Sequence, residues 1–240
     1  AVSLLAATDA SEQALGLKTL QELAAKPDLR APQIEQLMLL RVRKDKLTGG
    51  APWVETLARR EDGPALLGDT AIAVLLALHK GAGPEILAAQ LQKTNSTIEQ
   101  IQLGMVAVEF AAVLRKPQLA PLLASKTELV RELGKAAEAR LGGHDGASEL
   151  LALIEEEQPI VQNWALGFAD SAPADLRLAI LQALARQAQV VDGQHDQDFA
   201  RGALAAQGIA DDNTSAGRRV LGQLLQAESP GVVEAALAGL

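Results

Sequence analysis

Apolar residues recur along the chain at the three- and four-residue spacing of amphipathic helices, with helix-stopping residues after about every ten to fifteen positions. In residues 9–25, for example, Ala14, Leu17 and Leu20 share one face, and Asp9 is placed to cap the start. The pattern predicts about fourteen helices, at residues 9–25, 32–44, 52–60, 69–80, 84–93, 96–115, 117–124, 127–141, 148–157, 159–170, 174–188, 196–207, 215–227 and 231–240.

The composition supports an all-α fold. Hydrophobic residues make up 48% of the chain and aromatic residues only 2%, and no run alternates apolar and polar residues as a strand does. We therefore expect a helix content above about 60% with essentially no strand. The apolar content excludes a disordered chain, and charges or glycines interrupt every apolar stretch before it reaches the length of a membrane span.

Many short helices joined by short loops favour an α-solenoid, a right-handed array of antiparallel helix pairs, over a bundle of four long helices. No long linker divides residues 1–240, so we expect one continuous domain. Residues 130–137 can be aligned with 176–183 and 232–239 as a degenerate repeat. The chain starts without Met and ends at Leu240 inside an apolar pattern without a polar capping helix, so we expect it to be part of a longer protein.

Two of these helix starts resemble the second helix of a HEAT repeat, usually written Asp-Pro-x-Val-Arg-x-x-Ala. The segment from Ser229 keeps the Pro and the first Val but has Ser229 for the Asp and Val233 for the Arg. The segment 173–177 keeps the arginine, Arg177, with the Pro and Asp shifted. The resemblance implies a HEAT or armadillo-like fold, and it leaves the usual Asp–Arg ladder in doubt at Ser229.

A second resemblance covers residues 146–183. This stretch is similar to HEAT segments in large multidomain proteins of planctomycete-type bacteria, where a helical array lies between a β-propeller and a c-type cytochrome domain. It implies an extracytoplasmic location and more helices beyond Leu240, then a haem domain. The present chain has no cysteine, so it cannot itself attach haem covalently.

Charge and missing motifs exclude several function classes. The net charge of −8 has the wrong sign for a nucleic-acid binder. No cysteine is available for thiolate chemistry, and no phosphate loop, nucleophile elbow or zinc-helix motif occurs. We therefore expect no cofactor and no catalytic residue.

The remaining candidates for chemistry each have a simpler explanation. His195 lies among aspartates, but their spacing matches no metal loop, so we expect no specific metal site. His144 lies in a glycine-rich turn beside Asp145, with no nucleophile nearby. His79 is placed to end a helix, and residues 155–157, three adjacent glutamates, point in different directions on a helix.

Four residues are candidates for partner contact. Arg41 and Arg43 belong to the basic cluster 41–46, which could bind an acidic partner or simply complete a helix end. Trp53 and Trp164 could anchor a partner or fill gaps in the core.

The leading hypothesis is a non-catalytic scaffold or spacer that binds proteins or neighbouring domains. The alternative is a lyase-like helical-repeat enzyme or accessory domain with a polar site in the concave groove.

Overall fold

The computed structural model describes residues 1–26, 31–60, 65–156, 158–187 and 196–240. Within these residues, 79% is helix, in 15 α-helices with short 3-10 turns, and there is no strand. The all-α prediction and the expected helix content above about 60% are confirmed. None of the helices within the described ranges combines the length and apolarity needed to cross a bilayer, in agreement with the sequence.

Two compact units divide the chain, Ala1–His144 and Asp145–Leu240, and we describe each by itself. The N-terminal unit contains α1 (Val2–Leu5), α2 (Ala10–Ala25), α3 (Pro32–Lys44), η2 (Thr48–Gly50), α4 (Ala51–Ala58), α5 (Ala65–Leu78), α6 (Gly83–Lys93), α7 (Thr97–Glu109), η3 (Ala111–Val113), α8 (Lys116–Leu123), α9 (Glu128–Ala139) and η4 (Leu141–Gly143). The C-terminal unit contains α10 (Ala147–Glu155), α11 (Pro159–Ala169), α12 (Ala174–Gln187), α13 (Asp196–Asp212), α14 (Ser215–Leu224) and α15 (Pro230–Ala238).

Prolines and side-chain caps set where many helices begin, as the sequence predicts. Proline occupies the first or second position of α3, α4, α6, α8, α11 and α15, where its missing N–H costs nothing. Asp9 caps α2 by accepting hydrogen bonds from the backbone N–H groups of Ser11 and Glu12, at 2.7 and 3.2 Å.

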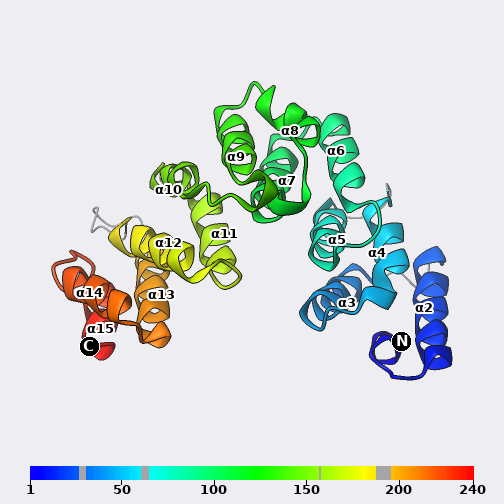
Figure 1. The fold of residues 1–240 in the computed structure, drawn as a ribbon, viewed down its shortest axis with the longest axis horizontal. Helices are drawn as coiled ribbons and strands as arrows, with labels where there is room; N and C mark the ends of the chain where they lie inside the picture. The colour runs from blue at the N-terminus through cyan, green and yellow to red at the C-terminus, as the bar shows by residue number, and fades with distance from the viewer. Residues whose placement is uncertain (27–30, 61–64, 157, 188–195) are drawn as a thin grey trace. The chain divides into compact units, whose positions relative to one another are not determined.

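Helices of the N-terminal unit pack in alternation. The odd-numbered helices contact one another in succession, from α1 through α3, α5 and α7 to α9, while α2 contacts α4 and α6 contacts α8 (Figure 1). Helix α5 is buried on almost every side because α3, α4, α6 and α7 all pack against it. Its sequence is accordingly apolar around the whole helix, with Asp69 as its one charged residue.

The same alternation occurs within the C-terminal unit. Helices α11, α13 and α15 contact in succession, and so do α10, α12 and α14 (Figure 1). Helices α12 and α15 therefore belong to different layers of this unit. The aligned segments 176–183 and 232–239 fall on these two helices, and their equivalence as repeats stays a prediction. The larger prediction, one continuous HEAT-type array over 1–240, stays a prediction.

Helix α1 was not predicted, and at three boundaries the structure differs from the prediction by four or more residues. Helix α5 begins at Ala65 rather than at Asp69, so Asp69 lies inside the helix and does not cap it. Helix α7 ends at Glu109 and a 3-10 turn follows it. The predicted helix 96–115 included this turn because the apolar spacing of a 3-10 turn is close to that of an α-helix. Helix α13 continues to Asp212, past Gly208.

Gly208 does not stop α13 because it serves helix packing. A Cβ at this position would lie 3.2 Å from the Leu181 side chain of α12, closer than ordinary contact. The glycine therefore lets α12 and α13 approach each other, and the structure uses it for proximity rather than for a break.

Candidate functional site

Trp53 fills the core of the N-terminal unit. It lies on α4 and is 1% exposed, and it is one of the largest fully buried side chains of the described residues. Of the two roles that the sequence left open, core filling is the one that this position serves. A side chain so covered presents no surface to a partner in the folded unit.

Trp164 is half-buried on α11 of the C-terminal unit and stacks on Phe168. The two ring centroids are 5.3 Å apart and the planes differ by 6°. Its indole Nε1 is buried and has no hydrogen-bond partner among the described residues. The stacking shows that the Trp164 ring packs on Phe168 within its own unit. A role of Trp164 in partner binding stays a prediction.

Arg41 and Arg43 both have intramolecular acidic partners. Arg41 pairs with Asp45 one turn later, although its side chain stays largely exposed. Arg43 pairs with Glu109 at the end of α7, and its guanidinium lies over the Phe110 ring, 5.4 Å from the centroid. Burial raises the pKa of Glu109, while Arg43 opposes this shift. Arg43 thus connects the C-terminal ends of α3 and α7.

The other candidates from the sequence do not converge on a site. His79 is exposed and follows α5 with φ of 50°, so it ends that helix as predicted. His144, Glu155 and Glu156 are exposed, while His195 and Glu157 lie outside the described residues. In the part of the chain that the structure describes, no group of three or more histidine or acidic residues is arranged to hold a metal ion.

Sequence reasoning did not single out a row of exposed aliphatic side chains on α3, α5 and α7. Leu37, Leu66 and Ile98 are 67%, 58% and 65% exposed. Thr70, one turn after Leu66 on α5, is half-buried, and so is Glu109 at the other end of α7 from Ile98.

Two polar contacts connect α3 with α5 and with α7. The Gln36 Nε2 of α3 donates to the Thr70 Oγ1 of α5 at 2.8 Å, and Arg43 of α3 pairs with Glu109 of α7. The N-terminal halves of α3 and α5 therefore adjoin, as do the C-terminal ends of α3 and α7. We call the surface formed by Leu37, Leu66, Ile98 and the side chains between them the α3–α5–α7 face.

Near the starts of α5 and α7 lie two acidic residues, the buried Asp69 and the half-buried Glu99. Asp69 of α5 is 5% exposed, and its Oδ2 has no hydrogen-bond partner among the described residues. Burial, and after it the negative charge of Glu99 on α7, raises the pKa of Asp69 to about 7. Glu99 itself accepts a hydrogen bond from Gln90 Nε2 at 2.6 Å and another from Thr94 Oγ1. An isolated aspartate within an apolar helix is the sequence signal that could have found Asp69.

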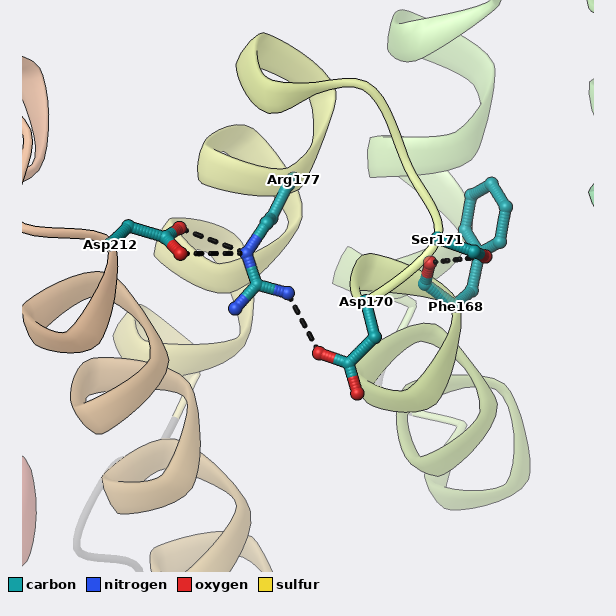
Figure 2. A network of polar contacts seen from close by, with 5 residues as sticks. All are labelled: Phe168, Asp170, Ser171, Arg177 and Asp212. Atoms are coloured by element: carbon teal, nitrogen blue, oxygen red, sulfur yellow. Dashed lines mark hydrogen bonds and ion pairs between the residues drawn. The ribbon is translucent and has the colours of Figure 1, made fainter. Parts of the chain in front are cut away.

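Arg177 connects three helices of the C-terminal unit (Figure 2). From the first turn of α12, its Nε donates to Asp212 at the end of α13, 2.8 Å from Oδ2. Its NH1 donates to Asp170 Oδ1 at the end of α11, at 2.7 Å. Both bonds raise the pKa of Arg177, that with Asp212 more strongly.

At α15, Ser229 is fully buried and Val233 is apolar, so these two side chains cannot form an ion pair like those of Arg177.

Replacing Arg177 with methionine should destabilise the C-terminal unit by about 1–2 kcal/mol, because the bonds to Asp212 and Asp170 are lost from a side chain that is only 20% exposed. Urea denaturation followed by Trp164 fluorescence measures this change. Asp212→Asn should cost more than Asp170→Asn, since Asp170 is largely exposed. The exposed Arg219 of α14 offers a control, and an equal effect of Arg219→Met would contradict the proposed link.

Comparisons with known proteins assign the chain to no family. No family model matches the chain, and no curated protein matches it. A solved structure described as the crystal structure of an engineered protein aligns with 99% of this chain at 18% identity, with a TM-score of 0.35. The chain spans 66% of that protein's length. A TM-score of this size carries no argument about fold or function.

Proposed function

We propose that the chain is a non-catalytic helical-repeat scaffold of the HEAT type that binds an amphipathic helix of another protein on its α3–α5–α7 face. The repeat part of the proposal is supported by regular spacing: α3, α5, α7 and α9 begin at residues 32, 65, 97 and 128. Each of these helices packs on the next, which is how neighbouring repeats build a solenoid.

The exposed row of Leu37, Leu66 and Ile98 is the observation that carries the binding part. Three large aliphatic side chains, each more than half exposed, lie on three helices that pack in succession. Full burial of such a side chain is worth about 1.5–3 kcal/mol, so covering the row would supply much of the free energy of a specific contact. A surface of this kind is suited to an apolar partner segment.

The spacing of the row indicates the form of the partner. Packed helices lie about 8–10 Å apart, and a helix rises about 1.5 Å per residue. A helix that crosses the row would therefore meet Leu37, Leu66 and Ile98 with apolar residues at about i, i+7 and i+14. Acidic residues at the end of the partner helix that reaches the C-terminal end of α3 would meet the exposed Lys44 and Lys46, whereas Arg41 and Arg43 already pair with Asp45 and Glu109.

An enzymatic role, the alternative from the sequence, would use a titratable group such as Asp69. A buried carboxyl with a pKa of about 7 is typical of acid–base catalysts. However, Asp69 is 5% exposed, so a substrate has no direct access to it in this arrangement. The scaffold function therefore has the stronger support.

A pair of designed peptides tests the proposed function. Both carry leucine at i, i+7 and i+14 of a helix, one with glutamate and the other with lysine at the flanking positions. In calorimetric titrations we expect the glutamate peptide to bind more tightly. Leu66→Glu, at the centre of the row, should weaken its binding at least about 10-fold, equivalent to about 1.4 kcal/mol.

Leu15 provides a matched control because it is 55% exposed but lies on α2, outside the face. Leu15→Glu should leave binding unchanged. Failure of both peptides to bind, or equal weakening by Leu15→Glu and Leu66→Glu, would refute the proposal.

A further inference from the structure

Asp69 is an unusual residue for its position. It lies in the second turn of α5, where the neighbouring residues Leu67, Ala71 and Ile72 are all buried and apolar. Its Oδ2 is buried and has no hydrogen-bond partner among the described residues. A buried carboxylate oxygen without a donor is costly, and binding a proton is the simplest way to relieve this cost.

Charged groups on the four helices packed against α5 do not compensate Asp69. On α3, Glu35 pairs with Arg60 and Arg43 pairs with Glu109, while Lys44 is exposed. On α4, Glu55 pairs with Arg59. The charged residues of α6 are Glu85 and Lys93, both exposed.

On α7, the negative charge of Glu99 opposes the ionisation of Asp69. His79, the other titratable group near α5, is exposed beyond the far end of the helix.

The acceptor atoms favour a proton over a metal ion at this place. Both carboxylate oxygens of Glu99 already accept hydrogen bonds, from Gln90 and from Thr94. The Oδ2 of Asp69 is thus the oxygen left to be satisfied, whereas Ca²⁺ or Mg²⁺ would need about six oxygen ligands.

We propose that the Asp69–Glu99 pair is a proton-binding switch under the α3–α5–α7 face: protonated Asp69 keeps the N-terminal turns of α5 and α7 together, and its ionisation separates them. Leu66 lies one turn before Asp69 on α5, and Ile98 directly precedes Glu99 on α7. Separation of these turns would therefore displace two of the three aliphatic side chains of the face. The consequence for binding rests on the proposed function, whereas the proton site itself does not.

The direction of the pH effect follows from linkage. The pKa of Asp69 is raised from 3.8 to about 7 in the folded chain, so between these values the folded state holds a proton that the unfolded state has lost. Stability should therefore fall as the pH rises from about 4 to about 7 and then level off. Above pH 7, folded and unfolded Asp69 are both ionised.

Carboxyl ¹³C NMR of the full chain, compared with Asp69→Asn to assign the signal, tests the proton site directly. We expect Asp69 to titrate near pH 7, and a midpoint below 5 would overturn the proposal. Urea midpoints measured from pH 5 to pH 8 should fall in the wild type and stay nearly constant in Asp69→Asn. Glu85→Gln, at an exposed carboxyl of α6, should retain the wild-type slope.

A second experiment measures the binding of the glutamate peptide at pH 6 and at pH 8 in a His79→Gln background, which removes the nearest histidine. Binding should be at least about 3-fold tighter at pH 6, and Asp69→Asn should abolish this difference. Loss of peptide binding at every pH, with the NMR titration retained, would refute the proposed function and leave the proton site intact. A rise of the urea midpoint with millimolar Ca²⁺ or Mg²⁺ at pH 8, absent in Asp69→Asn, would identify a metal site and overturn the proton switch.

Discussion

Replacing Trp53 with alanine should destabilise the N-terminal unit by about 3–5 kcal/mol, which is enough to unfold many domains of this size. The side chain is 1% exposed, and Val54, Leu57 and Ala58 of the same helix are buried around it. Removal of the indole leaves a cavity that helices in contact with their neighbours cannot close without shifting. The cost therefore includes both lost burial and an unfilled volume.

The two tryptophans allow this result to be measured unit by unit. Trp53 lies in the N-terminal unit and Trp164 in the C-terminal unit, so in Trp53→Ala the fluorescence of Trp164 follows the C-terminal unit while circular dichroism follows both units. Urea denaturation of Trp53→Ala by circular dichroism should show an earlier transition for the N-terminal unit. A loss below about 1 kcal/mol would contradict the core role and restore Trp53 as a candidate for partner contact.

Helix starts could be predicted because their causes are local. A proline at the first turn or an aspartate cap acts within a few residues, so Pro32, Pro159 and Asp9 are informative without knowledge of the fold. Contacts between helices, by contrast, have long-range causes. Gly208 lies inside α13, and only its approach to Leu181 of α12 shows what a glycine does at this position.

The candidate site was harder to predict for the same reason. An amphipathic pattern gives the buried face of one helix, but it does not show which exposed residues of different helices adjoin. Leu37, Leu66 and Ile98 are separated by about thirty residues each, and only helix packing brings α3, α5 and α7 together. The predicted helix 69–80 starts at Asp69, whereas α5 begins at Ala65. The burial of Asp69 depends on α7, which the sequence does not place.

Removing Glu35 should destabilise the N-terminal unit by about 3–5 kcal/mol, since it would leave Arg60 buried without its counter-charge. The Arg60 NH1 and NH2 groups donate to the two carboxylate oxygens of Glu35, each at 2.9 Å. The two side chains are only 7% and 10% exposed. Arg60 also contacts the carbonyl oxygen of Ala24 at 3.5 Å, so the pair connects the ends of α2 and α4 with α3.

A double-mutant cycle separates the pair interaction from the cost of burial. Glu35→Leu and Arg60→Met should each destabilise strongly, whereas the double variant should lie within about 1–2 kcal/mol of the wild type because no buried charge remains. The coupling free energy from urea denaturation should then be several kcal/mol. The exposed Lys18–Glu22 pair of α2, with nitrogen and oxygen 3.9 Å apart, is the control and should give less than about 1 kcal/mol. If the two cycles gave equal coupling, the Glu35–Arg60 pair would act as a surface ion pair, and the ends of α2, α3 and α4 would have to be held by apolar contacts alone.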